Sequence, residues 1–275
     1  MPTMCDVWER VAPGWRAHAD VVDARVAPVT DRMLARAVPA PGEHVLDVAC
    51  GPGGAGIAAA PRVAPGGTVV LSDIAPAMVA TAVERAAAAG LTGVTGHVAD
   101  MEDLGLPDAS ADVVLCREGL MFAADTGRAA AEIARVLRPG GRAAVAVWGP
   151  RDRNPWLGVV LDAVERAAGR PIPPPGVPGP FTLADGDRLA GLVSGAGLTA
   201  VAVEEVPVVT RVAPGDDWWG RTVALAGPLG GILAAMPDET RAAARADALA
   251  AAAAYEDGDG IALPGVALVA SGVAA

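Results

Sequence analysis

The chain has 275 residues, of which 52% are hydrophobic and 19% charged. That length is enough for one large α/β domain or two small ones, and the chain is too apolar to be mainly disordered. All 21 basic residues are arginine, 32 residues are acidic, and the formal net charge is −11. Nucleic acids and anionic membranes require a basic surface, so the charge argues against both as partners. The absence of lysine excludes chemistry that needs a Schiff-base or P-loop lysine.

The chain shows no pattern for export, membrane insertion or metal binding. Its three cysteines do not make a disulfide framework, and no spacing resembles a zinc site. The first ten residues include Asp6, Glu9 and Arg10, so the apolar core of a signal peptide is missing. No apolar run is long enough to span a membrane without glycine, proline or charge. We therefore predict a cytoplasmic protein with no metal and no membrane insertion.

Hydrophobic periodicity predicts helices at the N-terminus, followed by alternating strands and helices. The N-terminal helical segment covers residues 5–38 and is expected to break at Pro13-Gly14 and at Pro28. Strands are expected at residues 44–49, 68–73, 94–99, 112–116 and 142–148. The helices between them are expected at residues 55–64, 76–89 and 126–137, the last closed by Arg138-Pro-Gly-Gly141. This alternation is typical of a parallel sheet with helices on both faces.

The pattern is looser in the second half of the chain. The elements expected there are a helix at 155–168, a loop at 170–180, a helix at 189–196, a strand at 199–210, helices at 216–235 and 238–254, and a strand at 260–273. The predicted fold is an α/β, Rossmann-like, seven-stranded and mostly parallel sheet, with N-terminal helices and a helical insertion before the last strand. No linker separates the halves, so residues 1–275 are expected to form one domain.

Glycines and carboxylates stand where the first four predicted strands end, the edge at which open parallel sheets bind ligands. Cys50-Gly-Pro-Gly-Gly54 follows the first strand and, with Gly56, fits the GxGxxG pattern of dinucleotide-binding proteins. Asp73 at the end of the second strand fits the acid of that pattern, which binds a ribose. Asp47 and Asp100 argue against a nicotinamide dinucleotide. The charge of Asp47 would face a pyrophosphate, and Asp100 suits an adenine amino group.

Four stretches together resemble the class I S-adenosylmethionine-dependent methyltransferases in order and spacing. They are residues 45–54, 72–78, 99–101 and 135–141. Residues 178–185 and 259–265 look like the ubiquinone/menaquinone-methyltransferase-like (methyltransferase type 11) small-molecule group, with less specific motifs. One departure is Ala49, which stands where the family pattern acid-x-Gly-x-Gly has its first glycine.

This resemblance implies S-adenosylmethionine as the cofactor and a set of residues that bind it. The set is Asp47, Ala49, Gly51, Gly53, Asp73, Ile74, Met78, Asp100, Met101, Arg117 and Trp15. The two loop glycines let the backbone approach the methionine portion. Asp47 takes the ammonium, Asp73 the ribose hydroxyls and Asp100 the adenine amino group, while Met101 and Met78 pack against adenine. Structural alternatives stay open: Asp73 as a helix N-cap, Asp100 as a solvated loop acid and Met78 as a core residue.

The resemblance also divides the chain by function. Residues 1–40 form an N-terminal helical lid and residues 41–150 the S-adenosylmethionine-binding core. Residues 151–275 complete the sheet and carry a helical cap at about 211–258. Methyl transfer needs alignment and exclusion of water, and a base adds roughly 10²–10⁴-fold for a hydroxyl or an acidic carbon. The candidate bases are Glu118 and His18, with a solvated acid and a surface histidine as the alternatives.

An acceptor pocket is predicted from the few aromatic residues of the lid and the cap. They are Trp8, Trp218, Trp219 and Tyr255, and their alternative role is that of bulky residues in an alanine-rich core. We therefore predict methyl transfer to a small, apolar or aromatic acceptor by a monomer or homodimer. A related fold that catalyses cyclisation or only binds is the first alternative, and an NAD(P)-dependent oxidoreductase is the second. No Asn/Asp-Pro-Pro-aromatic stretch follows the fourth strand, which argues against methylation of a flipped base.

Overall fold

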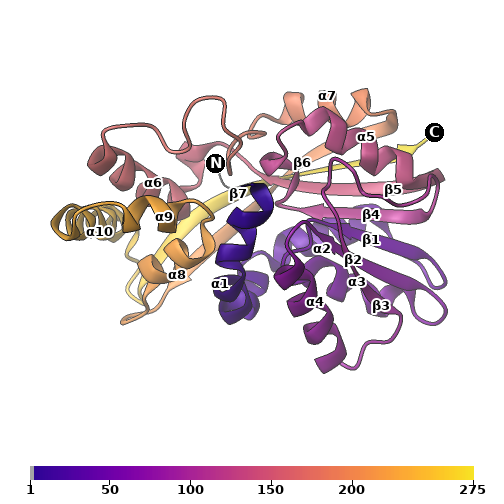
Figure 1. Cartoon of the computed structure of the whole chain (residues 1–275), viewed down its shortest axis with the longest axis horizontal. Coiled ribbons are helices and arrows are strands. Elements are labelled where there is room, and N and C mark those ends of the chain that lie inside the picture. The colour runs from indigo at the N-terminus through magenta and orange to yellow at the C-terminus, as the bar shows by residue number, and fades with distance from the viewer. Residues whose placement is uncertain (1–2) are drawn as a thin grey trace.

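The computed structural model describes residues 3–275. Its central layer is a seven-stranded sheet with the order β3-β2-β1-β4-β5-β7-β6 (Figure 1). The strands are β1 His44–Val48, β2 Thr68–Asp73, β3 Val94–Val98, β4 Ala111–Arg117, β5 Leu137–Trp148, β6 Leu198–Val212 and β7 Ile261–Ala274. Strands β1 to β5 pair in parallel, and β7 runs antiparallel between β5 and β6. The seven-stranded, mostly parallel sheet predicted from the sequence is confirmed.

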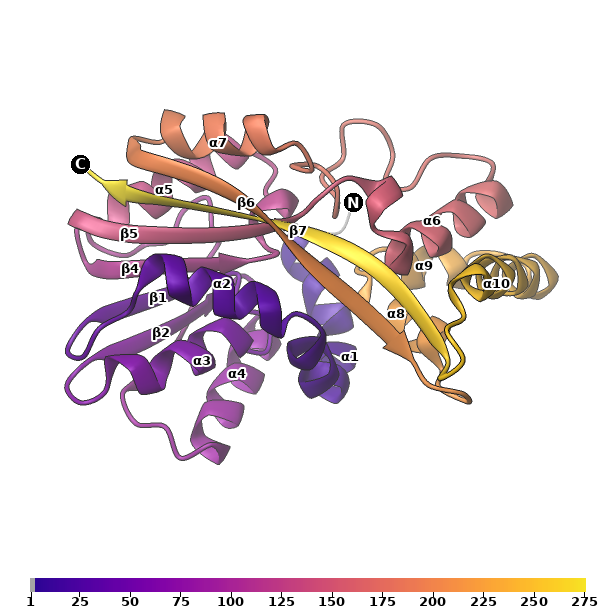
Figure 2. The ribbon, with the colours of Figure 1, turned by 180° about the vertical axis from the view of Figure 1, so that it is seen from behind.

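Helices cover both faces of this sheet. Helices α2 and α3 pack on one face, and α5 and α7 on the other (Figure 2). The helices are α1 Met4–Arg25, α2 Ala27–Ala37, α3 Gly54–Val63, α4 Pro76–Ala88, α5 Thr126–Val136, α6 Pro155–Ala168, α7 Gly186–Gly195, α8 Trp218–Leu225, α9 Leu229–Ala234 and α10 Asp238–Ala252, with short 3-10 turns η1 Leu120–Phe122, η2 Arg151–Arg153 and η3 Ala253–Tyr255. Four of the five residues of β1 are buried, as expected for a strand between two helical layers.

The predicted helical insertion before the last strand is present. Strands β6 and β7 form a long ladder from Leu198 opposite Ala274 to Val212 opposite Ile261. This ladder extends beyond the other strands, and α8, α9 and α10 lie between its two strands in sequence (Figure 2). Helix α1 packs against both α4 and α8. It therefore connects the first half of the sheet with the insertion.

The predicted break at Pro13-Gly14 is wrong, because α1 continues through both residues. Proline inside a helix removes a hydrogen bond and costs about 3 kcal/mol, so tertiary contacts must outweigh it. Val11 and Ala12 are buried one turn before Gly14. A Cβ on Gly14 would overlap the carbonyl oxygen of Ala224 in α8. The missing side chain lets the two helices approach closely, and their packing stabilises α1 across the proline.

Two other element predictions need correction. Residues 216–235 form two helices, α8 and α9, rather than one. Gly227 has a φ of 46° and is followed by Pro228, which disfavours a helical conformation in the residue before it. The segment Arg138–Gly141 belongs to β5 rather than only closing a helix, because Leu137 already pairs with Ala111 of β4.

Within residues 3–275, no helix combines the length and the apolar character that a membrane crossing requires.

Candidate active site

The glycine loop between β1 and α3 leaves open space at the carboxyl edge of the sheet. Gly53 has a φ of 88°, and a Cβ there would approach the Cβ of Ala82 to 2.8 Å. Gly51 has a φ of 53°, and no atom lies within 4 Å of the position that its Cβ would take. Both glycines therefore fit their predicted role: the loop needs their conformation, and its backbone can be approached at Gly51.

Asp47 is buried in β1 and keeps one oxygen without a partner. Its Oδ2 accepts a hydrogen bond of 2.7 Å from the backbone N–H of Gly56, in the first turn of α3. Its Oδ1 is buried and has no hydrogen-bond partner among the described residues. Burial raises the pKa of Asp47 to about 7, although the charge of Arg117 and the bond from Gly56 oppose that shift. A cationic amino group would satisfy Oδ1 and favour the ionised form, so this carboxyl group fits the ammonium of the predicted cofactor.

Asp73 connects the glycine loop to the start of α4. Its Oδ2 accepts a hydrogen bond of 2.9 Å from the Gly51 N–H, and its Oδ1 accepts one of 3.0 Å from the Ala75 N–H. Burial raises the pKa of Asp73, while these amides oppose the shift. The N-cap of α4 is Ala75, so Asp73 is not an N-cap residue. Each carboxylate oxygen has a further lone pair, which is what two ribose hydroxyls would need.

The residues predicted near adenine lie in two different environments. Asp100 is exposed, and its Oδ1 accepts a hydrogen bond of 2.9 Å from the Glu102 N–H. Met101 is partly buried against the core. Met78 is 2% exposed and packs in a small cluster with residues of α1. Met78 therefore packs as a core residue, which is the structural alternative to a contact with adenine. Asp100, in contrast, is accessible from solvent.

The predicted aromatic residues do not form one group. Trp8 packs beside the Met78 cluster, with its ring centroid 5.0 Å from that of Phe122 and 6.5 Å from that of Trp15. Trp218 and Trp219 begin α8 and belong to the main core, and Tyr255 is only partly buried against it. Trp15 links the two regions, because its Nε1 donates a hydrogen bond of 3.0 Å to the carbonyl of Leu225 in α8. Trp8 thus packs with predicted cofactor residues, in a different cluster from Trp218 and Trp219.

Helix α1 lies across the predicted cofactor site through contacts that sequence reasoning missed. Glu9 Oε1 accepts a hydrogen bond of 2.7 Å from the Ala77 N–H in the first turn of α4. Asp23 accepts bonds of 2.7 Å from Arg117 Nη2 and 2.8 Å from Arg85 Nη2. The Arg117 side chain is therefore engaged with α1, which leaves mainly its backbone for the predicted contact with the cofactor. These pairs join residues more than sixty positions apart, and no local pattern marks them.

Two further predicted site residues lie at α1: Ile74 contacts this helix, and His18 is part of it. The carbonyl of Ile74 accepts a hydrogen bond of 3.3 Å from the thiol of Cys5 in α1. His18 is partly buried on α1, and its charge contributes to lowering the pKa of Asp216, which is lowered mainly by the hydrogen bond from Arg221. His18 therefore lies near the start of the insertion, where α1 meets α8.

Glu118 combines a strained backbone with an unpartnered carboxyl oxygen. Its φ is 59°, a region that residues other than glycine rarely adopt, and its N–H donates a hydrogen bond of 2.7 Å to the Ala146 carbonyl. Its Oε1 is buried with no partner among the described residues. Burial raises the pKa of Glu118, against the charges of Arg117 and Arg25. Such strain in a non-glycine residue is concentrated at functional sites, and this makes Glu118 the stronger of the two candidate bases.

Ala49 adopts the left-handed backbone conformation for which the family pattern has a glycine, with a φ of 53°. We expect Ala49→Gly to raise the free energy of unfolding by about 0.5–1 kcal/mol, because glycine adopts this conformation without steric cost. Urea unfolding would measure the change. Ala87→Gly, at an exposed position of α4, is the control and should lower the free energy of unfolding by about 1 kcal/mol. If Ala49→Gly instead lowered the free energy of unfolding, the inference that the backbone of Ala49 is strained would be wrong.

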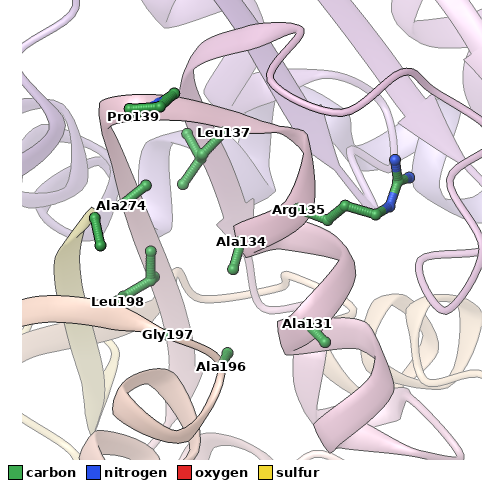
Figure 3. A pocket seen from close by; sticks show the side chains of 10 residues that line it. Ala131, Ala134, Arg135, Leu137, Pro139, Ala196, Gly197, Leu198 and Ala274 are labelled. Carbon is green, nitrogen blue, oxygen red and sulfur yellow. The ribbon is translucent and has the colours of Figure 1, made fainter.

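A groove of about 400 Å³ lies at the opposite edge of the sheet, where β5 begins and β7 ends (Figure 3). Its lining includes Arg135, Leu137, Pro139 and Leu198. The residues predicted to bind cofactor or acceptor do not line it. The carboxyl edge of the parallel strands therefore remains the candidate active site.

The fold and the carboxyl-edge residues define a Rossmann-like ligand-binding protein, with the glycine loop after β1 and carboxylates on β1 and β2. Comparison with known proteins narrows this class. Residues 45–141 match the family model described as "Methyltransferase domain". A nocamycin O-methyltransferase from Saccharothrix syringae is 38% identical over 185 residues, which cover 60% of this chain and 65% of that protein. The chain thus spans less than two thirds of that relative's length.

Two solved structures share the fold. The YcgJ protein of Bacillus subtilis has a TM-score of 0.59 and 21% sequence identity, covering 89% of this chain and 97% of that one. The [4+2]-cyclase SpnF has a TM-score of 0.52 and 22% identity, covering 90% of this chain and 80% of that one. Residues 45–141 thus resemble a methyltransferase domain, and the two solved structures share the overall fold of the chain.

Proposed function

We propose that the chain transfers a methyl group from S-adenosylmethionine to a small, apolar or aromatic acceptor. The observation that carries this proposal is the pair of buried carboxyl groups beside the glycine loop. Asp47 has a free buried oxygen for an ammonium, and Asp73 is placed for ribose hydroxyls next to the open backbone of Gly51. Asp100 and Met101 would hold adenine. The nocamycin O-methyltransferase relative supports a small-molecule acceptor.

Bound S-adenosylmethionine would supply a methyl group activated by its sulfonium. The protein has to align the acceptor and exclude water, and α1 is placed to do both because it packs against α4 and α8. Glu118, just after β4, would take the proton of a hydroxyl or an acidic carbon on the acceptor. Its raised pKa brings it closer to neutral pH, where a general base is most effective.

The pH dependence of cofactor affinity should report Asp47. Its pKa is about 7 in the ligand-free fold, so below that pH the carboxyl group is protonated and cannot pair with an ammonium. Affinity is expected to rise by up to about tenfold per pH unit below about pH 7 and to level off above it. Calorimetry would measure this dependence, and Asp47→Asn should remove this part of it. The two proteins are compared below about pH 7, where the ligand's own amino group stays charged. An unchanged pH dependence in Asp47→Asn would exclude Asp47 from this role.

Methyl transfer itself is tested by incubating the full chain with methyl-labelled S-adenosylmethionine and a panel of phenols, quinols and carboxylic acids. The proposal expects labelled product and stoichiometric S-adenosylhomocysteine. A second candidate function, cyclisation on the same fold, is kept because of the likeness to the [4+2]-cyclase structure. Product mass separates the two, because a methylated product gains a CH₂ unit and a cyclised isomer does not. Turnover with an isomerised product and no labelled methyl group would favour cyclisation.

A further inference from the structure

A guanidinium lies against two indoles, tilted by 55° to each other, at the carboxyl end of β5. Arg25 is the last residue of α1, and its Cζ is 4.2 Å from the ring centroid of Trp156 and 5.7 Å from that of Trp148. Both tryptophans are buried, with ring centroids 4.8 Å apart. The Nε of Arg25 is buried and has no hydrogen-bond partner among the described residues. The indoles attract the cation through their π faces, but they do not satisfy its buried Nε–H.

The neighbouring arginines already have partners. Burial lowers the pKa of Arg25, the charge of Glu118 opposes that shift, and the charges of the nearby Arg117 and Arg221 add to it. Arg117 pairs with Asp23 at 2.7 Å. Arg221 makes two bonds, of 2.7 and 2.8 Å, to Asp216. Within residues 3–275, Arg25 makes no ion pair of this kind. The charge of Glu118 acts on Arg25, but no carboxylate among the described residues is hydrogen-bonded to it. A buried cation without such a partner is costly, so Arg25 is the guanidinium that an anionic ligand would complete.

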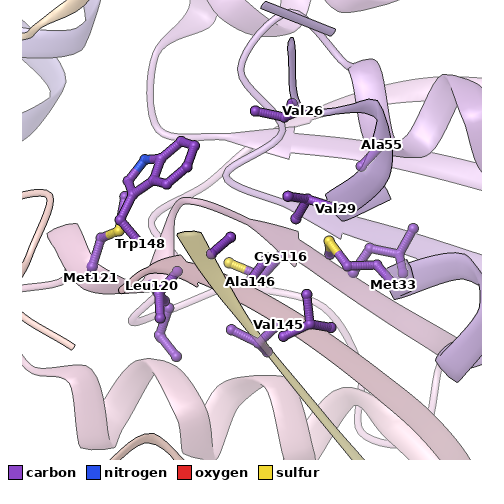
Figure 4. Close-up of a cluster of buried hydrophobic side chains, with 14 of the residues drawn as sticks. Val26, Val29, Met33, Ala55, Cys116, Leu120, Met121, Val145, Ala146 and Trp148 are labelled. Atoms are coloured by element: carbon purple, nitrogen blue, oxygen red, sulfur yellow. The ribbon is translucent and has the colours of Figure 1, made fainter. Parts of the chain in front are cut away.

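The surroundings of Arg25 belong to the acceptor side of the site. Glu118 follows β4 and Trp148 ends β5, whereas Asp47 and Asp73 lie on β1 and β2, on the other side of β4. Trp148 and Met121 belong to the same cluster of buried apolar side chains (Figure 4). A ligand that reaches Arg25 would therefore meet apolar side chains beside the guanidinium. The position is thus suited to the acceptor rather than to the ribose or the adenine.

We propose that Arg25 binds a planar oxyanion of the acceptor, a carboxylate or an enolate. This inference rests on the proposed function and narrows its acceptor to an oxygen acid. The fork of a guanidinium makes two parallel hydrogen bonds to such a group. Trp148 and Trp156 hold the fork in place, and Glu118 is close enough for its charge to act on Arg25. An uncharged acceptor of the same shape leaves Arg25 unpaired.

The test compares anionic probes with uncharged ones on the full chain saturated with S-adenosylhomocysteine. Calorimetry would measure benzoate against benzamide, for a carboxylate, and 4-hydroxycoumarin against coumarin, for an enolate. We expect at least one anion to bind ten or more times tighter than its uncharged counterpart. The pair that shows the preference identifies the kind of oxyanion. Equal binding within both pairs would overturn the proposal.

Variants assign the preference to Arg25. Arg25→Gln should abolish it, and Arg25→Lys, which keeps the charge but loses the fork, should reduce it at least threefold. Arg62→Gln, at an exposed position of α3, removes the same charge and should leave it unchanged. If Arg25→Gln does not fold, Arg25→Lys decides, and an unchanged preference there would overturn the proposal. The proposal would also be overturned if the Arg25 variants lost as much affinity for S-adenosylhomocysteine as for the anion, because Arg25 would then bind the cofactor.

The same titrations keep the two proposals apart. Failure of S-adenosylhomocysteine to bind the native chain would count against the proposed function. In that case the binding of anionic and uncharged probes, measured in the absence of S-adenosylhomocysteine, would still test the role of Arg25. Binding of S-adenosylhomocysteine without any anion preference would leave the proposed function standing and reject the oxyanion site.

Discussion

Asp73→Ala is expected to weaken S-adenosylmethionine binding by about 1–3 kcal/mol, roughly a 5- to 150-fold rise in Kd. The carboxylate would bind the ribose, and it also accepts the N–H groups of Gly51 and Ala75, so its loss frees the glycine loop. Asp100→Ala should have a smaller effect, because the Asp100 side chain is exposed and its hydrogen bonds compete with water. Calorimetric titration would measure both variants.

Asp31→Ala is the matched control for these two variants. Asp31 is exposed on α2 and lies outside the candidate site, so its replacement should leave the Kd unchanged. Thermal unfolding of the same samples would show whether Asp73→Ala keeps its fold. A folded Asp73→Ala protein with native affinity would remove Asp73 from the ribose role.

Glu118→Gln is expected to lower kcat by about 10²–10⁴-fold while the Kd for S-adenosylmethionine changes little. The substitution keeps the shape of the side chain but removes the group that would accept a proton. Its backbone strain, about 1–3 kcal/mol for a non-glycine residue in this region, is retained, so the fold should be preserved. Single-turnover methyl transfer at saturating cofactor would measure the effect.

His18→Gln is the comparison for Glu118→Gln, because His18 is the other candidate base and lies near Asp216. We expect His18→Gln to lower kcat less than Glu118→Gln does. In the native chain the rate should fall on the acid side of a pKa above that of a free glutamate, since burial raises the pKa of Glu118. Native turnover in Glu118→Gln would mean that the acceptor reacts without this base.

The core of the fold and the cofactor half of the site are local in sequence, and this is why they could be predicted. Apolar runs such as residues 68–73 are bounded by glycine and proline, and each ends in the residue that the site uses. Asp47, Gly51 and Asp73 lie at or beside strand ends, so the parallel topology alone brings them together. The structure adds what holds them, namely the amides of the loop and of the first turn of α3.

The proposed oxyanion site depends on contacts between distant segments, which no local pattern in the sequence marks. Arg25 meets Trp156 across more than 130 positions, and Asp23 meets Arg117 across 94. No spacing rule connects such residues. The same reason explains Pro13, where proline propensity predicted a break and the packing of α1 on α8 kept the helix continuous. The aromatic residues were grouped by their rarity, but the structure places Trp8 apart from Trp218.

Calorimetric titration of the full chain would show whether the carboxyl edge of this sheet holds S-adenosylmethionine. S-adenosylmethionine, S-adenosylhomocysteine and NADH would be titrated under the same conditions. We expect S-adenosylmethionine and S-adenosylhomocysteine to bind saturably with a Kd of roughly micromolar order, which corresponds to a binding free energy of about −8 kcal/mol. We expect no binding of NADH. Binding of NADH alone would contradict these expectations: the glycine loop would then hold a nicotinamide dinucleotide, and the buried carboxyl group of Asp47 would need another explanation.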